Sequence, residues 1–177
     1  MTIVQARNAV VAGLEKNIGC PVILTDQIAE QSAFPYCYYS VLAPRISNHA
    51  FGLSEIELDD KQGYRLMRSE PVLATMSFTF CGMNRNSDDG GYIYGEDEAL
   101  DIAEKGHGFF LLSGHCITTE VGDIVIQNVG NIQSRTGFLV EEAIRRYGFD
   151  VKLRYVRTDE MPNTIISKVK PAWLKNL

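Results

Sequence analysis

The residues best suited to chemistry are three histidines, His49, His107 and His115, and four cysteines. A structural zinc site usually takes such ligands from close pairs, about two to five residues apart. No histidine lies three or four residues from another histidine or from a cysteine, the spacing that would join two ligands on a helix. His115 and Cys116 are adjacent, and adjacent side chains on a strand point to opposite faces. The sequence therefore predicts no metal site.

Nucleophilic catalysis is the second possibility, and it depends on Cys116. A thiol becomes a nucleophile when a base lies beside it, so folding would have to bring His49 or His107 there. Ser113-Gly114-His115 lacks the Gly-x-Ser-x-Gly turn that exposes a catalytic serine. The cysteines form no Cys-x-x-Cys pair and are expected to be free thiols, packed as small apolar residues in a reducing compartment. We predict that the chain is not an enzyme; the alternative requires a reactive Cys116 or a bound metal.

Acidic pairs and glycine-rich loops are the remaining signals for catalysis or cofactor binding. Asp59-Asp60, Asp88-Asp89 and Glu96-Asp97-Glu98 lie in turns or at a helix start, where acidic residues are favoured for local reasons. None has the Asp-x-Asp-x-Asp-Gly spacing of a calcium loop. Gly90-Gly91 precedes a helix, but that helix opens with acidic residues, which would repel a phosphate. The sequence therefore predicts no cofactor.

The clearest charged feature is a basic cluster in the last third of the chain. It has three interpretations: a solvated strand face balanced by neighbouring acidic residues, a seam of salt bridges between subunits, for which arginine's forked geometry is suited, or a DNA-binding surface. The net charge of −5 and a pI near 5.2 disfavour the third, because a protein that grips phosphates normally carries a basic excess. The cluster consists of Arg135, Arg145, Arg146, Lys152, Arg154 and Arg157.

The composition is that of a globular protein. The chain has 177 residues, of which 45% are hydrophobic and 22% charged, enough for one core and short for two domains. It has no apolar run of about 20 residues, which a membrane span needs, and no basic-then-apolar N-terminus typical of a signal peptide. We therefore expect one domain over residues 1–177, made and kept in a cytoplasm, with no membrane contact.

Two helices are expected to position the rest of the chain. In the first, over residues 3–18, Thr2 and Gln5 have the spacing of a capping box and apolar residues recur at helical intervals. Gly19 suits a left-handed C-cap. The second, at about residues 95–112, has an acidic first turn, which the helix dipole favours. Because each helix carries an apolar stripe, both are expected to cover a sheet.

The predicted strands lie at residues 22–24, 35–42, 64–70, 72–81, 116–134 and 149–155. Pro44 is expected to close the second of these, and Pro71 to interrupt the pairing between the third and the fourth. In residues 72–81 apolar and polar side chains alternate, so one face is core and the other semi-polar. Residues 138–147 fit either a helix or the beginning of a long strand.

Two further segments lack a strong period. Residues 45–63 hold isolated apolar residues among polar ones, which indicates an extended arm or hairpin that projects from the body. Residues 159–177 carry two prolines and form a tail that is expected to bind a partner or pack loosely. Together with the helices and strands, these segments predict an α+β fold with a mixed or largely antiparallel sheet, two main helices and a projecting arm.

The order of these motifs resembles the neck or tail terminator proteins of tailed phages and prophages. The resemblance covers roughly residues 3–157, and its most specific parts are residues 129–136 and the Ile-Arg-Arg-Tyr-Gly-Phe-Asp-Val motif at 144–151. It departs in the arm and in the tail. The other matching segments are residues 19–23, 35–39 and 69–78 and the helix with the acidic start.

The resemblance implies a structural virion protein without catalytic residues or cofactor. Six copies of such an α+β unit close into a ring at the head-proximal end of the tail, where the ring ends the tail tube and offers a surface to the neck or connector. The implied partners are other copies of the chain, the tail tube protein, the neck or connector protein and, in a contractile tail, the sheath protein. DNA passes through the lumen without specific binding. The alternative is another head–tail joining, completion or adaptor role.

A closed ring repeats one heterologous interface around its axis. The interface residues that we expect combine specific polar groups with aromatic ones, and they lie in the two most specific motifs. The arm of residues 45–63 is the segment expected to reach a neighbouring subunit or the next ring. The predicted interface residues are Asn131, Gln133, Arg135, Arg145, Arg146, Tyr147 and Phe149.

Overall fold

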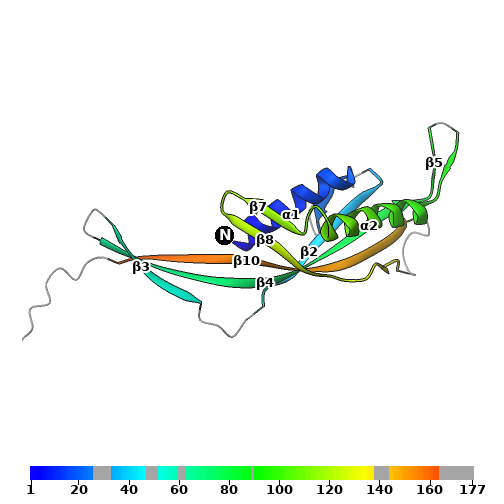
Figure 1. Ribbon diagram of the computed structural model, residues 1–177. Coiled ribbons are helices and arrows are strands. Elements are labelled where there is room, and N and C mark those ends of the chain that lie inside the picture. Colours follow the sequence, from blue (N-terminus) through cyan, green and yellow to red (C-terminus); the bar gives the residue numbers. More distant parts are fainter. Residues whose placement is uncertain (26–32, 47–51, 60–62, 89, 138–143, 164–177) are drawn as a thin grey trace, which may run out of the picture.

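The structure is a computed structural model, and it describes residues 1–25, 33–46, 52–59, 63–88, 90–137 and 144–163. Two helices lie on one side of a large curled sheet, which confirms the α+β class (Figure 1). The elements are α1 (Ile3–Ile18), β1 (Val22–Leu24), β2 (Tyr36–Ile46), β3 (Leu53–Asp59), β4 (Gly63–Met83), β5 (Arg85–Asn86), β6 (Tyr92–Ile93), α2 (Gly95–Leu111), β7 (Cys116–Thr119), β8 (Gly122–Val129), β9 (Gln133–Ser134) and β10 (Ile144–Asn163).

The sheet is built around one long pair of strands. Its order is β1-β2-β4-β10-β8-β7, with β3 also paired to β4 and β9 also paired to β10. β4 and β10 are antiparallel over nearly their full lengths, from Ile144 opposite Met83 to Asn163 opposite Tyr64. Among the described strands, β1 and β2 pair in parallel and the other pairs are antiparallel. The sheet is therefore mixed but largely antiparallel, as predicted.

The β4–β10 pair runs through two regions of different construction. In the body, β2 and β8 flank the pair and the helices cover one face (Figure 1). In the arm, the pair continues past the helices with β3 beside it, and Leu53 opposite Ser69 is the pair nearest the body. Figure 1 shows the arm projecting from one end of the body. We define the arm as residues 53–59, 63–70 and 157–163. It confirms the predicted projection, although residues 47–51 and 60–62 lie outside the described residues.

Local sequence explains how the helices start and pack. The Thr2 side chain accepts from the Gln5 amide at 3.3 Å, and the Gln5 side chain accepts from the Thr2 amide at 2.8 Å, the reciprocal pair of a capping box. Gly19 ends α1 with a φ of 73°. α2 approaches β4 closely because Gly82 and Gly95 lack side chains: a Cβ at Gly82 would lie 2.2 Å from the Gly95 carbonyl oxygen.

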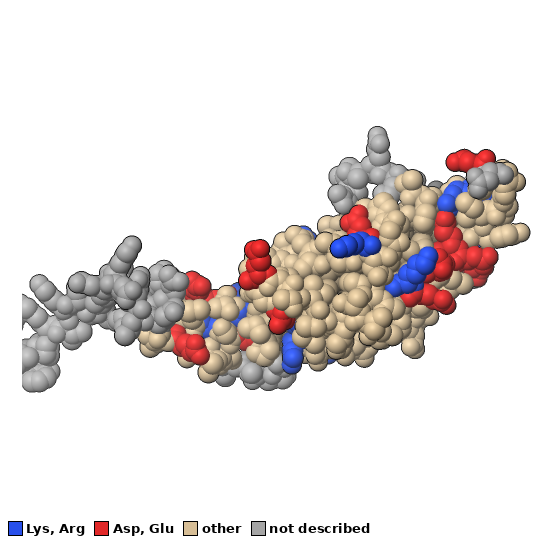
Figure 2. All heavy atoms as spheres, turned by 45° about the horizontal axis from the view of Figure 1, so that its top comes forward, with Lys and Arg blue, Asp and Glu red and all other residues tan. Residues whose placement is uncertain are grey.

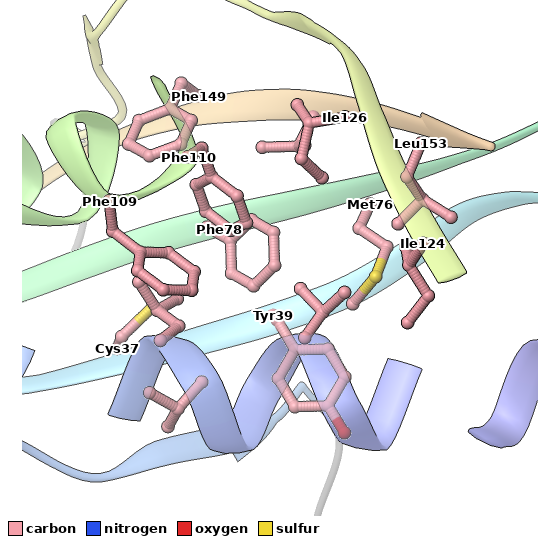
Figure 3. Packing of buried hydrophobic residues seen from close by; sticks show 14 of the residues in the cluster. Cys37, Tyr39, Met76, Phe78, Phe109, Phe110, Ile124, Ile126, Phe149 and Leu153 are labelled. Carbon is pink, nitrogen blue, oxygen red and sulfur yellow. The ribbon is translucent and has the colours of Figure 1, made fainter. Parts of the chain in front are cut away.

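The core of the body lies between the helices and the sheet (Figure 3). Every second residue of β4 from Val72 to Phe80 points into it and is at most 2% exposed. The rings of Phe78 and Phe110 have centroids 5.2 Å apart, and Phe80 stacks on Phe149 at 5.5 Å. Burial of these rings is the main source of stability in the body.

Two expectations about proline are wrong. β2 continues past Pro44 to Ile46, as an irregular strand whose register with β4 shifts there, and proline is tolerated in such edge positions. β4 passes through Pro71 without a break. The reason is that its neighbour changes at this point: Ser69 pairs with β3, and Leu73 pairs with β2.

The structure describes part of the two segments whose prediction was ambiguous, residues 138–147 and the tail from Asp159. β10 starts at Ile144 and remains paired with β4 to Asn163, so residues 144–147 are strand and the tail predicted from Asp159 begins later. Residues 138–143 and 164–177 lie outside the described residues. Between β4 and α2 the short strands β5 and β6 pair as a small antiparallel hairpin. Among the described helices none is long and apolar enough to cross a membrane.

Candidate interaction surfaces

The first surface without a covering layer is the sheet face that turns away from the helices. We call it the open face. On β4 it carries the odd-numbered residues, including Thr75, Ser77 and Thr79, and on β10 it carries the residues opposite them, such as Lys152 and Asp150. Ser77 and Thr79 are nevertheless buried, at 8% and 3% exposure. Something other than a helix therefore covers this part of the open face.

The cover is an arginine that follows β9. The Arg135 guanidinium donates to Ser77 Oγ at 2.6 Å, to Thr79 Oγ1 at 2.8 Å and to Asp150 Oδ1 at 2.7 Å. Ser77 also donates to Asp150 Oδ1, at 2.7 Å. We call these four residues the Arg135 network. Its hydrogen bonds are charge-assisted and so about twice as strong as neutral ones, and they fix the segment after β9 on the open face.

Gly148 provides the space for this network. A Cβ at this position would lie 2.9 Å from Arg135 Cδ and 2.4 Å from the Phe78 carbonyl oxygen. Arg135 therefore lies over bare backbone. Burial opposes the ionisation of Asp150, but hydrogen bonds from Ser77 and Arg135 outweigh it and hold the pKa of Asp150 below its ordinary value. The Asp150 carboxyl is therefore ionised at neutral pH.

The predicted interface residues fall into different environments. Asn131 and Gln133 are exposed. The Arg135 side chain forms its hydrogen bonds within the Arg135 network. Phe149 is 1% exposed and packs in the core against Phe80, which corrects the prediction for this residue, since its side chain offers no surface to a partner.

The remaining three, Arg145, Arg146 and Tyr147, are partly exposed at the start of β10. The Tyr147 hydroxyl donates to Glu96 Oε1 at 2.8 Å, which raises the pKa of the phenol and ties β10 to the first turn of α2. The Arg135 amide donates to the Arg146 carbonyl oxygen at 2.8 Å. The structure therefore brings the two predicted motifs side by side, and their contact with another subunit stays a prediction.

The basic cluster divides into paired and unpaired members. Arg135 pairs with Asp150 and Arg157 pairs with Asp159, both at 2.7 Å. Three other members, Arg145, Lys152 and Arg154, form no ion pair with any residue that the structure describes. Lys152 and Arg154 lie on the open face, opposite Thr75 and Leu73 of β4.

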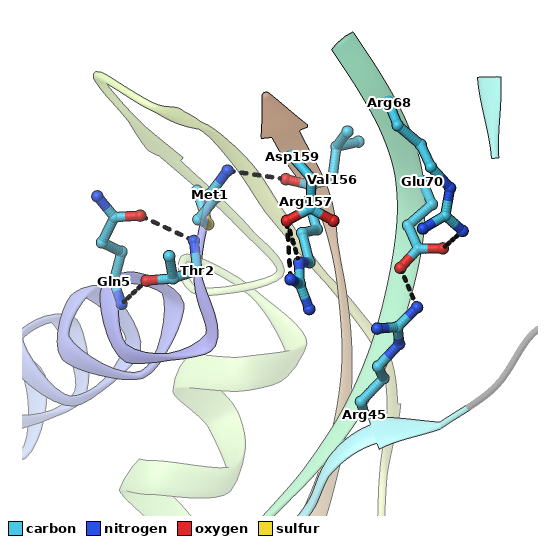
Figure 4. Close-up of polar contacts among 9 residues, drawn as sticks. All are labelled: Met1, Thr2, Gln5, Arg45, Arg68, Glu70, Val156, Arg157 and Asp159. Carbon is cyan, nitrogen blue, oxygen red and sulfur yellow. Dashed lines mark hydrogen bonds and ion pairs between the residues drawn. The ribbon is translucent and has the colours of Figure 1, made fainter. Parts of the chain in front are cut away.

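The base of the arm is held by polar contacts on the helix side (Figure 4). Glu70 is 6% exposed and accepts hydrogen bonds from Arg45 of β2 and from Arg68, the latter at 2.7 Å. The amine of Met1 donates to the Val156 carbonyl oxygen at 3.2 Å. A groove between the start of α1 and the arm has a lining that includes Met1, Ile3, Pro44, Val72 and Tyr155. These contacts fix the direction in which the arm leaves the body.

Beyond its base the arm exposes apolar side chains on both faces. The pairing places Ile56, Leu66 and Met161 in one row across three strands, and Ile56 and Met161 are 69% and 55% exposed. On the other face Leu53 is 63% exposed and neighbours Glu55. A ribbon one layer thick cannot bury both faces, and a cluster of exposed apolar residues is typical of a surface that binds a partner.

The acidic end of the body has a local explanation. Figure 2 shows acidic side chains gathered where α2 begins, at the opposite end from the arm. The first turn of α2 carries Glu96, Asp97 and Glu98, whose negative charges interact favourably with the helix dipole. Glu98 pairs with Arg85 at 2.6 Å, and Glu96 accepts from Tyr147. The acidity of this end is therefore accounted for within the chain.

Three of the four cysteines considered first for chemistry, Cys20, Cys37 and Cys81, are buried. Burial raises the pKa of the Cys37 and Cys81 thiols, and burial together with the Glu15 carboxylate raises that of Cys20 to about 11. Such thiols are poor nucleophiles at neutral pH. Cys116 is exposed. The part of the chain that the structure describes contains no group of three or more histidine, cysteine or acidic residues able to hold a metal, and His49 lies outside it.

Sequence reasoning missed the partners of Arg135 and the role of Gly148. Two signals pointed to them: the polar alternation of Thr75, Ser77 and Thr79 in a buried strand, and a glycine inside the Arg-Arg-Tyr-Gly-Phe-Asp motif. A polar strand face needs hydrogen-bond partners when it is buried. A glycine within a strand often marks a close approach of other atoms.

Comparison with known proteins identifies one family. The model of a protein family described as phage neck terminator protein matches residues 2–172. No curated protein matches. One similar solved structure is 15% identical, with 84% of this chain and 94% of that chain covered and a TM-score of 0.42. The family assignment therefore rests on the family model, which spans nearly the whole chain.

Proposed function

We propose that this chain, which belongs to the family of phage neck terminator proteins, forms a closed ring at the head-proximal end of a phage tail. The ring ends the growing tail tube and joins it to the neck or connector. The observation that carries the proposal is the family match over residues 2–172, because it includes the body and the arm alike. The chain acts as a structural component of the virion and not as an enzyme.

A ring of identical copies suits this task. The end of a tube has rotational symmetry, and copies that repeat one heterologous contact around the same axis can cover all of it. We propose six copies, the number that the family resemblance implies. The arm supports a contact of this kind, because it projects from the body and carries exposed apolar residues that a neighbouring copy would bury.

The charge of the chain suits a conduit for DNA. A net charge of −5 disfavours the phosphate contacts that give nucleic-acid binding its affinity, so DNA passes through the lumen without being held. The remaining partners are the tail tube protein on one side and the neck or connector protein on the other. In a contractile tail the sheath protein is a further neighbour.

Assembly of tail tubes with and without the chain tests this function. We expect tubes formed from tube protein alone to keep lengthening, and tubes formed with the chain to stop at one end that carries a ring in negative-stain images. Unchanged tube lengths and bare tube ends would contradict the proposal. Decoration of the tip-proximal end or of the head would instead favour an adaptor or head-completion role.

A further inference from the structure

We propose that the arm of one copy packs on the open face of a second copy. This inference rests on the proposed ring and names the contact that closes it. The acceptor is the part of the open face next to the arm, where β10 carries Lys152 and Arg154. The pairing places Arg154 opposite Leu73 of β4 and Val125 of β8, so a cation lies between two apolar side chains in one row.

The acceptor lacks a partner within the described residues. Both helices cover the other side of the sheet. Arg154 is exposed, Lys152 is partly exposed, and neither forms an ion pair with a described residue. Val156, two residues further along β10, is 54% exposed on the same face. This surface is therefore basic and apolar.

The arm supplies a surface of opposite charge. Glu55 of β3 is exposed and lies opposite Met67 of β4 in one cross-strand row. Leu53, 63% exposed, lies two residues from Glu55 on the same face. Because β4 pairs with β10 without a register shift, this row belongs to the same sheet face as Lys152 and Arg154. The arm surface is therefore acidic and apolar.

An arm that packs on the open face must belong to a second molecule. The arm and the body share β4 and β10, which run unbroken from one region into the other. The arm therefore cannot fold back onto the open face of its own body unless β4 and β10 break. Since a single chain carries both complementary surfaces, the occupant that fits is another copy, and opposite charges at such a contact select the correct partner.

Charge reversal on each surface tests the contact. One variant carries Glu55→Lys on the arm, and the other carries Lys152→Glu and Arg154→Glu on the open face. Each variant alone brings like charges together, so we expect the concentration for half-assembly to rise at least about tenfold. In an equimolar mixture every contact again joins opposite charges, and we expect assembly to return to within a few-fold of the parent chain. Sedimentation of the full chains, alone and with tube protein, measures both effects.

Controls and outcomes keep this contact separable from the ring itself. Glu104→Lys on the exposed face of α2 serves as the matched charge control, and thermal unfolding checks that every variant folds. Two reversed variants that each assemble like the parent, or a mixture that fails to assemble, would overturn the arm contact and leave the ring standing. If mixing the two variants restored assembly but gave a particle of only two copies, this result would support the arm contact and overturn the ring. A parent chain that stays monomeric overturns both.

Discussion

The body and the arm are made from the same two strands and differ in what covers them. In the body, alternate residues of β4 from Val72 to Phe80 are at most 2% exposed beneath the helices. In the arm, Leu53, Ile56 and Met161 are more than half exposed. Strand pairing therefore extends well beyond the core. The body is stabilised by burial, whereas the arm depends on its hydrogen-bond ladder and on polar contacts at its base, as expected of a region with low local stability.

This difference suggests separate roles for the two regions in the proposed ring: the body provides a fixed shape, and the arm provides a contact surface. A buried body gives every copy the same rigid shape, which a closed ring needs. In the proposed ring, an arm with exposed apolar residues gains its missing burial when it packs on a neighbouring copy. The predictions below test that division, beginning with the largest expected effect.

The strongest contrast comes from removing one apolar side chain in each region. Phe78→Ala leaves a cavity in the core among Tyr39, Phe110 and Phe149, and should lower the free energy of unfolding by about 3–5 kcal/mol. Ile56→Ala in the arm should change it by less than about 0.5 kcal/mol in the isolated subunit. Urea unfolding followed by circular dichroism measures both. Similar losses at the two sites would remove the distinction between body and arm.

The second prediction concerns the close contact on the open face. Gly148→Ala places a Cβ against Arg135 and the Phe78 carbonyl oxygen, so it should destabilise the body by about 1–3 kcal/mol. Gly137→Ala is the matched control, since a Cβ there meets no atom within 4 Å. Equal stability of the two variants would show that Arg135 does not lie against the strand as described.

The third prediction concerns the base of the arm. Glu70→Gln removes the charge that Arg45 and Arg68 share, and it should lower stability by about 1 kcal/mol. The loss should be local: hydrogen exchange should quicken in β3 and in the arm part of β4, while amides of the body keep their protection. Glu104→Gln, on the exposed surface of α2, is the control. Faster exchange throughout the body would argue that the arm and the body unfold together.

The smallest effect is the pH dependence of the Arg135 network. The pKa of Asp150 is lower in the folded chain than its unfolded value of about 3.9. The carboxylate therefore stabilises the fold above that pH, and its contribution is lost as the pH falls through the folded pKa. Because Asp150 is 48% exposed, we expect less than about 1 kcal/mol.

Unfolding of the parent and of Asp150→Asn from pH 7 to pH 2 tests this sign. The difference between the two should be largest near neutrality and should shrink in acid. A difference that grew as the pH fell would contradict the assigned hydrogen bonds.

The elements that local sequence determines were predictable. Thr2, Gln5 and Gly19 fix both ends of α1 through contacts within a few residues. The continuity of β4 was not predictable from Pro71, because it depends on where β3 and β2 end on a neighbouring edge. The projecting arm was visible as a weak alternation, but the contribution of β10 to it required long-range pairing between residues 157–163 and β4.

The candidate surfaces were predictable only in part. Asn131 and Gln133 are exposed as an interface requires. Arg135 was chosen for a contact between subunits, yet its observed partners Ser77 and Thr79 lie more than fifty positions earlier in the chain. For Phe149 the alternation with Val151 and Leu153 already indicated a core face. We nevertheless predicted an interface role because Phe149 is an aromatic residue in one of the two most specific motifs.

The central claim, that copies of this chain close into a ring, is tested most directly by the mass of the assembled particle. Analytical ultracentrifugation of the full chain, alone and after incubation with tail tube protein, gives that mass, and images of the tube ends give its symmetry. We predict a sixfold ring, free or bound to the tube end. A chain that remains monomeric in both conditions, or that forms only a pair, would contradict the account.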